Sequence, residues 1–257
     1  MSRGHAHHHH LYRPADTVLH RLPPQCKLAA VLAFVLIVVS TPRTQFWAFG
    51  VYAALLAAVA LAAHVPIGLV VRRMVVEVPF VLFAVLLPFI AQGARVDVLG
   101  VSVSESGLLG AWNILAKGSL GVIASILLTA TTEPRALLFG LERLHMPQLM
   151  VKIMQFMFRY ADVITSELHR MRIARESRGF EARDLRQARV LAHSAGALFI
   201  RSYERGERVH LAMLSRGYDG TMPVIAEPRS GGTSWATAAV LPAAALAVAV
   251  SAWVVQR

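Results

Sequence analysis

The sequence predicts an all-α integral membrane protein, with about five transmembrane helices and a cytoplasmic module of long amphipathic helices. Of its 257 residues, 56% are hydrophobic and only 16% are charged, whereas a soluble domain is about one-quarter charged. The mean hydropathy is +0.53, yet the net charge is +11. Both values fit if the apolar residues lie in a bilayer and the charges gather in a separate segment. This composition argues against a disordered chain, a nucleic-acid-binding protein and most cytosolic enzymes, so we expect the lipid bilayer as a partner, and no nucleic acid.

Five charge-poor runs mark the expected spans, since a helix needs roughly 20 apolar residues to cross a bilayer core. They are residues 28–39, 46–63, 75–91, 108–131 and 235–255. The first run is short, and we expect it to cross only with the help of its flanks. These runs divide the chain into an N-terminal segment (1–27), transmembrane helices one to four (28–132), a cytoplasmic module (133–230) and a last transmembrane helix (231–257).

The basic residues outside the spans predict the orientation, because loops rich in Lys and Arg face the cytoplasm. Four basic residues precede the first span, and Arg72 and Arg73 end the loop between the second and third. The opposite loops hold Arg43 alone, and Arg95 balanced by two acidic residues. We therefore expect the N-terminal segment and the region after Thr131 in the cytoplasm. Five spans then place the C-terminus outside.

The long segment between the fourth and fifth spans predicts helices. Residues 133–229 hold sixteen Lys and Arg and eleven Asp and Glu, which is too mixed in sign for a lipid-binding polybasic tail. An apolar stripe at helical spacing consists of Leu149, Ile153, Met157, Tyr160, Ile164, Leu168 and Met171. We expect a second helix over residues 185–215, and glycine caps at Gly179 and Gly217. The stripe must be buried, and burial within the chain is favoured over burial against a partner.

Both helix ends carry the pattern Ala-x-x-Ser-Arg-Gly-aromatic. Its members are Ala174, Ser177, Arg178, Gly179 and Phe180 in the first copy, and Ala212, Ser215, Arg216, Gly217 and Tyr218 in the second. Glycine ends a helix and lets another backbone approach, arginine offers a planar fork of donors, and an aromatic ring fills a pocket. One copy alone would indicate an ordinary capped helix end with a solvated arginine. Two copies favour a pair of docking tips.

These residues resemble the twin Ala-Arg-Gly signatures of the transmembrane (T) component of energy-coupling factor transporters, most closely the cobalt-type component CbiQ. Both triplets of this chain begin with serine, which is nearly isosteric with alanine. The segments 20–28 and 158–171 are also similar to that family, and residues 201–205 with 216–220 are similar to its cobalt and nickel branch. The resemblance covers most of the chain and is strongest in the cytoplasmic module.

The resemblance implies a coupling subunit of a cobalt-ion importer in a bacterial cytoplasmic membrane. Its implied partners are two ATP-binding (CbiO-like) subunits and a substrate-capturing membrane subunit (CbiM-like), with a small accessory membrane subunit (CbiN-like) as a further candidate. Each triplet would dock one ATPase subunit through Arg178 or Arg216, with Gly179 and Gly217 shaping the tips. The supporting, closely packed positions would be Ala174, Ser177, Ala212 and Ser215.

The sequence also predicts what this chain does not do itself. It contains no Gly-x-x-x-x-Gly-Lys-Ser/Thr phosphate loop, and no Gly-Lys dipeptide at all. We therefore expect no enzymatic activity and no cofactor bound by this chain, with ATP and Mg bound by the partner ATPase subunits.

Other functions stay open at the level of sequence. The residues do not specify the cargo, so a T component for nickel or a vitamin is an alternative. From another class, a membrane-embedded lipid-phosphate enzyme would use the basic module as a phosphate site, although its acidic residues are scattered rather than clustered for magnesium. A channel would need polar residues along a common pore, and Lys117 and Glu77 alone are too few.

A lysine, a histidine-rich segment and a cysteine can each be interpreted as structural or as functional. Lys117 lies in the middle of a span, where it is either functional or faces a polar gap near Asn113. The histidines of residues 5–10 are expected to form a flexible tail rather than a metal site. Cys26, the only cysteine, is expected to be a packing residue, and it excludes an intrachain disulfide.

Overall fold

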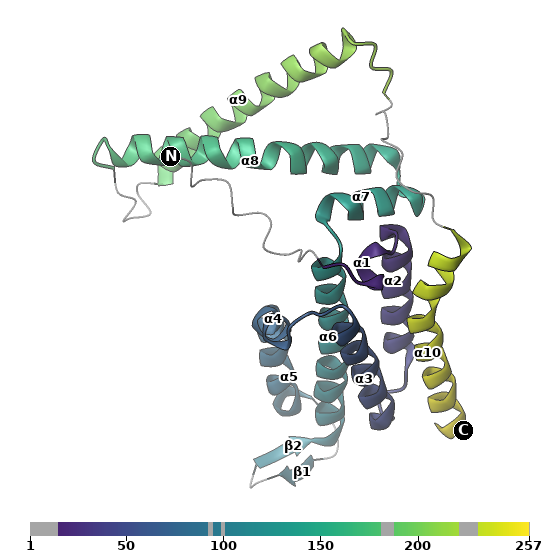
Figure 1. Cartoon of the computed structure of the whole chain (residues 1–257). Coiled ribbons are helices and arrows are strands. Elements are labelled where there is room, and N and C mark those ends of the chain that lie inside the picture. The colour runs from purple at the N-terminus through teal and green to yellow at the C-terminus, as the bar shows by residue number, and fades with distance from the viewer. Residues whose placement is uncertain (1–14, 92–94, 99–100, 181–187, 221–230, 257) are drawn as a thin grey trace. The chain divides into compact units, whose positions relative to one another are not determined.

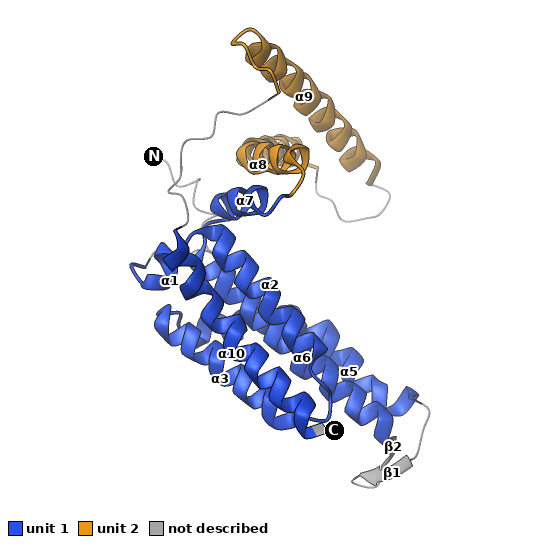
Figure 2. Ribbon diagram, turned by 90° about the vertical axis from the view of Figure 1, so that its right-hand side faces the viewer, with its two compact units in different colours: residues 1–145, 228–257 blue, residues 146–227 orange. Residues whose placement is uncertain are grey.

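The computed structural model describes residues 15–91, 95–98, 101–180, 188–220 and 231–256. Figure 2 shows its two compact units, which are residues 1–145 with 228–257, and residues 146–227. We refer to the first as the membrane unit and to the second, after the location that the sequence predicts for it, as the cytoplasmic unit.

The membrane unit is a helical bundle (Figure 1). In chain order it contains α1 (Val18–Arg21), α2 (Pro24–Ser40), α3 (Phe46–Ala62), α4 (Ile67–Arg73), the 3₁₀ turn η1 (Met74–Glu77), α5 (Val78–Ile90), β1 (Arg95–Val98), β2 (Val101–Ser104), α6 (Glu105–Thr131), α7 (Pro134–Arg143) and α10 (Gly232–Gln256). Helices α2, α3, α6 and α10 lie side by side, and α5 packs along α6. The predicted all-α membrane fold is confirmed, with one short hairpin added.

The five predicted apolar runs are helical, except for the capping residues Ala63 and Ala91 at the ends of two of them. Among the described residues, three helical stretches are long and apolar enough to cross a bilayer, namely Ile67–Ile90, Glu105–Thr131 and Gly232–Val255. Helices α2 and α3 have 17 residues each, at the lower limit of about 17 residues for a span. Large apolar side chains such as Phe80 and Ile90 are exposed on the bundle, as a lipid-facing surface requires.

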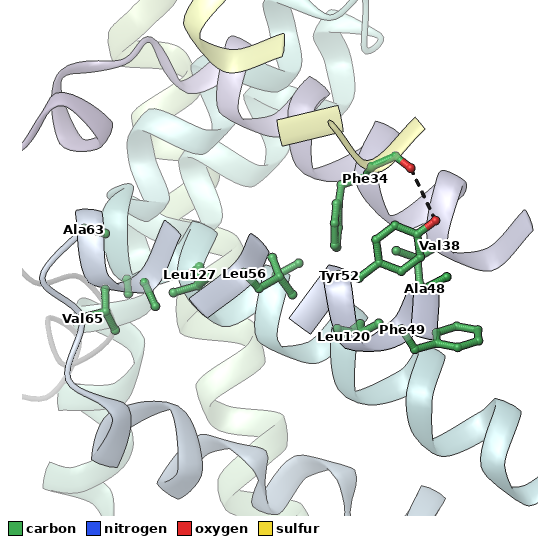
Figure 3. Packing of buried hydrophobic residues seen from close by; sticks show 14 of the residues in the cluster. Phe34, Val38, Ala48, Phe49, Tyr52, Leu56, Ala63, Val65, Leu120 and Leu127 are labelled. Atoms are coloured by element: carbon green, nitrogen blue, oxygen red, sulfur yellow. Dashed lines mark hydrogen bonds between the residues drawn. The ribbon is translucent and has the colours of Figure 1, made fainter. Parts of the chain in front are cut away.

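The core of the bundle combines aromatic rings from α2 and α3 with leucines and alanines from α6 and alanines from α10. Figure 3 shows Phe34, Phe49 and Tyr52 together, with the ring of Tyr52 meeting the other two edge to face. The Tyr52 hydroxyl lies 2.9 Å from Thr41 Oγ1 and 3.4 Å from the Ala245 carbonyl oxygen. Because a lipid environment supplies no hydrogen bonds, this hydroxyl joins α3 to α2 and α10.

Two lysines of the membrane unit donate hydrogen bonds to backbone carbonyls at the ends of neighbouring helices. Lys117 of α6 donates to the Val39 carbonyl at 2.6 Å, and Lys27 of α2 donates to the Thr131 carbonyl at 2.9 Å. Val39 and Thr131 lie in the last turns of α2 and α6, whose carbonyls have no partner within their own helix. The structure therefore favours a packing role for Lys117, with the α2 backbone as its partner. Cys26 is fully buried, as the sequence predicted.

Two connections differ from the sequence analysis. The loop expected to end at Arg72 and Arg73 is helical, because α4 begins directly after Pro66 and carries both arginines in its last turn. The connection between α5 and α6 contains an antiparallel hairpin in which Arg95 pairs with Ser104 and Val98 with Val101. Valine at every second position of each strand explains this hairpin, since β-branched residues favour strands.

Helix α7 belongs to the membrane unit, although the predicted cytoplasmic module begins at residue 133. It packs on the start of α2, and Gly140 makes this approach possible. A Cβ atom at Gly140 would lie 2.9 Å from Leu28 Cδ1 and 3.0 Å from the Gln25 backbone nitrogen. Any larger residue would push the two helices apart.

The cytoplasmic unit consists of α8 (Gln148–Glu176) and α9 (Ala188–Leu214), close to the predicted ranges. Glu167 of α8 joins them, because it accepts hydrogen bonds from Arg201 of α9 at 2.6 Å and from Arg170 at 2.5 Å. The expected burial of the α8 stripe within the chain is not found in the described residues. Leu149 and Met157 are 64% and 65% exposed.

Candidate functional site: two capped helix tips

The first tip, at the end of α8, is closed by a Schellman cap. Gly179 has φ +75°, its backbone N–H donates to the Glu176 carbonyl at 3.0 Å, and the Phe180 N–H donates to the Arg175 carbonyl at 3.1 Å. This pair of bonds around a left-handed residue defines the motif. Glycine is needed because a side chain strongly disfavours the left-handed conformation.

The second tip, at the end of α9, repeats this geometry. Gly217 has φ +80°, its N–H donates to the Leu214 carbonyl at 3.0 Å, and the Tyr218 N–H donates to the Met213 carbonyl at 3.0 Å. The predicted glycine caps are therefore confirmed at both helices. The repeated sequence pattern corresponds to a repeated backbone structure.

The cap geometry also explains the serine and the alanine of the pattern. The N–H of Arg178 donates to Arg175 instead of continuing the helix, so the Ala174 carbonyl needs another donor. The Ser177 hydroxyl supplies it at 3.2 Å. In the second copy, the Ser215 hydroxyl donates to the Ala212 carbonyl at 3.0 Å. Serine at the first position of the triplet thus closes the last turn, a role that alanine lacks.

Both tips present their arginines to the surroundings. Arg178 and Arg216 are exposed, as are Ala174, Ser177, Ala212 and Ser215, while Phe180 and Tyr218 are half-buried. Within the described part of the chain, neither arginine takes part in a salt bridge. Nearby, Glu176 is paired with Arg172 at 2.7 Å. Each tip is therefore a small exposed knob with one charged fork free to bind carboxylates or carbonyls.

The structure keeps the two tips apart. Figure 1 shows α8 and α9 crossing, with the two tips at the far ends of the pair. The cleft at the crossing is lined by Val163, Glu167, Leu198, Arg201 and Arg205, among others, and contains no tip residue. The cytoplasmic unit thus contains two separate tips with the same backbone geometry.

One contact near the second tip was missed at the level of sequence. Lys152, near the start of α8, donates to the Gly220 carbonyl just after the α9 cap. It fastens the second tip to the first helix. No local pattern could reveal this contact, since it depends on how the two helices cross.

The described residues were also compared with the requirements of a metal site. Among the described residues, no three His, Cys, Asp or Glu side chains gather in a way that could hold a metal ion. The histidine-rich segment 5–10 lies outside the described residues.

Comparison with known proteins agrees with these features. A family model described as CbiQ, cobalt transport protein, matches residues 15–225. The energy-coupling factor transporter transmembrane protein EcfT of Brevibacillus brevis is 31% identical over 227 residues, which make up 81% of this chain and 83% of that protein. EcfT of Staphylococcus aureus is 27% identical over 228 residues, or 82% of this chain and 83% of that protein.

A shorter match involves an archaeal relative. An uncharacterized protein of Methanocaldococcus jannaschii is 36% identical over 107 residues, which make up 41% of this chain and 40% of that protein. The family-model match, in contrast, includes both tips and every helix of the bundle except α10, and the EcfT matches cover four-fifths of the chain. The chain therefore belongs to the CbiQ family of transmembrane (T) components of energy-coupling factor transporters.

Proposed function

We propose that this chain is the coupling subunit of an importer for cobalt ions. It links two cytosolic ATPase subunits to a substrate-capturing membrane subunit and transmits ATP-driven motion between them. In this proposal the N-terminal segment and the cytoplasmic unit face the cytoplasm. The chain binds no nucleotide and catalyses no reaction itself.

The observation that carries the proposal is the duplication of the tip. Two copies of one exposed backbone motif suit two copies of one partner, and an ATPase that works as a pair needs two equivalent contacts. The Schellman cap fixes the backbone at each arginine, so little backbone entropy is lost when the arginine docks. Arginines flanked by aromatic rings are common anchors of protein interfaces.

The cargo is supported less directly. The matching family is described as a cobalt transport protein, whereas the EcfT relatives carry no cargo in their names. Cobalt is therefore our first proposal, with nickel or a vitamin as the alternative. Uptake of radioactive cobalt and nickel by cells that contain the whole complex would separate them, since a cobalt importer takes up cobalt at the lower concentration.

The docking role predicts a specific loss. Arg178→Ala and Arg216→Ala should each leave the protein in the membrane but weaken ATPase binding by about 2 kcal/mol or more, which is about thirtyfold. The measurement is the amount of ATPase, with a phosphate loop, that co-purifies with the tagged chain from its native membrane. The substrate-capturing subunit should be retained in both variants.

Two other arginines serve as matched controls. Arg172 of α8 and Arg208 of α9 are exposed and pair with glutamates on their own helices, so their replacement by alanine should leave ATPase binding intact. Undiminished ATPase recovery with the Arg178→Ala, Arg216→Ala double variant would refute the docking role. Recovery of the wild-type chain alone, stable and monodisperse, would refute the scaffold function.

A further inference from the structure

One apolar pocket lies in the membrane unit, at the end of the bundle where α2 and α10 begin and α3 and α6 end. Its volume is about 440 Å³, within the range of about 300–1,000 Å³ typical of small-molecule sites. Val31, Val59, Leu127 and Leu241 line it from four helices, and Leu19 of α1 contributes from the fifth. The walls offer almost no hydrogen-bonding groups, so water is a poor occupant.

Among the described residues that line this pocket, one carries a positive charge. Lys27 lines it and is only 8% exposed. Its three ammonium donors go to the Thr131 carbonyl at 2.9 Å, Thr132 Oγ1 at 3.2 Å and the His20 carbonyl at 3.3 Å. All three acceptors are neutral, and no carboxylate pairs with Lys27 in the described residues.

A buried ammonium without an anion is an expensive arrangement, and proteins normally pair such a charge. The longest of the three contacts, to His20, is the easiest to exchange for a stronger acceptor. The best occupant of the pocket therefore has an anionic group at one end and a long apolar body. Membrane phospholipids with a net negative charge have this structure, and the pocket is built from helices that such lipids surround.

We propose that this pocket binds an anionic phospholipid, with one acyl chain along Val31, Val59 and Leu241 and the phosphate paired with Lys27. The pocket itself does not depend on the transport partners. In the proposed orientation it opens to the cytoplasmic leaflet, whose anionic lipids give that surface a negative potential. A lipid held there would pack α10 against α2 and α3 at the end of the bundle where α2 and α10 begin.

The test uses the full chain, delipidated in detergent and titrated with phosphatidylglycerol, with bound lipid counted by native mass spectrometry. Lys27→Gln removes the cation and should weaken phosphatidylglycerol binding by about fivefold, the value of one lysine at a lipid surface. Ala58→Trp fills the pocket and keeps Lys27, and it should abolish binding of the first lipid. Lys27→Arg should retain binding, which separates charge from folding.

Matched controls lie next to the tested positions. Ala57 lies on the same helix as Ala58, and Lys117 is another lysine that donates to a carbonyl at a helix end. Neither residue lines the pocket, so Ala57→Trp and Lys117→Gln should bind like the wild type. Equal phosphatidylglycerol binding by the wild type, Lys27→Gln and Ala58→Trp would overturn the proposal. Equally tight binding of phosphatidylcholine would refute the pairing of phosphate with Lys27. Equally tight binding of glycerol phosphate, which has no chain, would show a free-anion site instead of a lipid site.

Discussion

At the scale of single residues, the two tip glycines make an unusual demand on the backbone. A Cβ atom at Gly217 would meet no atom within 4 Å, so space does not exclude a side chain there. The left-handed φ of +80° disfavours a side chain instead, because an L-residue pays about 1–2 kcal/mol in this conformation. We expect Gly217→Ala to open the α9 cap and to speed hydrogen exchange at the Tyr218 amide by about five- to thirtyfold. Exchange measured by mass spectrometry on peptides covering 211–220 tests this.

Replacing a glycine inside the same helix should change hydrogen exchange in the opposite direction. Gly206 also has no neighbour within 4 Å of a Cβ atom, but it lies inside α9. Because alanine is favoured over glycine in a helix by about 1 kcal/mol, Gly206→Ala should slow exchange in α9. If both variants changed exchange in the same direction, the left-handed cap would not be the reason for glycine at Gly217.

The residues of the site differ in how far the sequence could predict them. The two glycine caps follow from local chemistry, since each involves only a few consecutive residues, and the pattern predicted both caps correctly. The hydrogen bonds of Ser177 and Ser215 were not predicted. Each serine donates to a carbonyl that loses its helical partner at the cap, and the sequence does not show which carbonyl this is. The bonds of Glu167 to Arg201 and of Lys117 to Val39 join residues 34 and 78 positions apart, and no pattern specifies such pairs.

At the scale of elements, the crossing of α8 and α9 should depend on pH through Glu167. The Arg170 and Arg201 guanidinium groups, in that order, hold the pKa of this carboxyl below its usual value of 4.5. A carboxyl with a lowered folded pKa stabilises the fold above the unfolded pKa, and this stabilisation is lost as the pH falls through the folded value. The crossing should therefore be constant from neutral pH to about 4.5 and loosen below it.

Spin labels on exposed positions of the two helices can measure this opening. Cysteines introduced at Ser166 and Ala195 can be labelled selectively, because Cys26 is fully buried. Glu167→Gln should give the loosened distance distribution at every pH. Glu204→Gln is the control, since Glu204 pairs at 3.9 Å with Arg208 inside α9 and does not join the helices. An unchanged distance down to pH 3, or an unchanged distance in Glu167→Gln, would rule out this role.

The elements show where periodicity succeeds as a predictor and where it fails. The long helices were identified because their apolar residues either form a continuous run or recur about once per helical turn. The hairpin between α5 and α6 was missed because two four-residue strands are too short to stand out in a charged loop. The α8 stripe was correctly placed on one helix, but its burial was not predicted correctly, since periodicity specifies a face and not what covers it.

At the scale of the whole molecule, the helix order predicts which surfaces share a side of the membrane. Helices α2 and α10 begin, and α3 and α6 end, around one pocket, so the chain alternates direction between successive spans. The hairpin and the start of α6 then lie on the side opposite to α7. In the proposed orientation, with the basic N-terminal segment inside, we expect the tips in the cytoplasm and Glu105 on the outer side.

Single cysteines can test this topology in intact cells. Cys26 is fully buried and should stay unlabelled, so no background substitution is needed. A membrane-impermeant maleimide should label Glu105→Cys from outside, whereas Ser177→Cys should react only after the membrane is opened. Both positions are exposed in the structure, so a difference in labelling reports their side and not their accessibility. Labelling of Ser177→Cys in intact cells would place the tips outside, away from any source of ATP, and the coupling function would then be wrong.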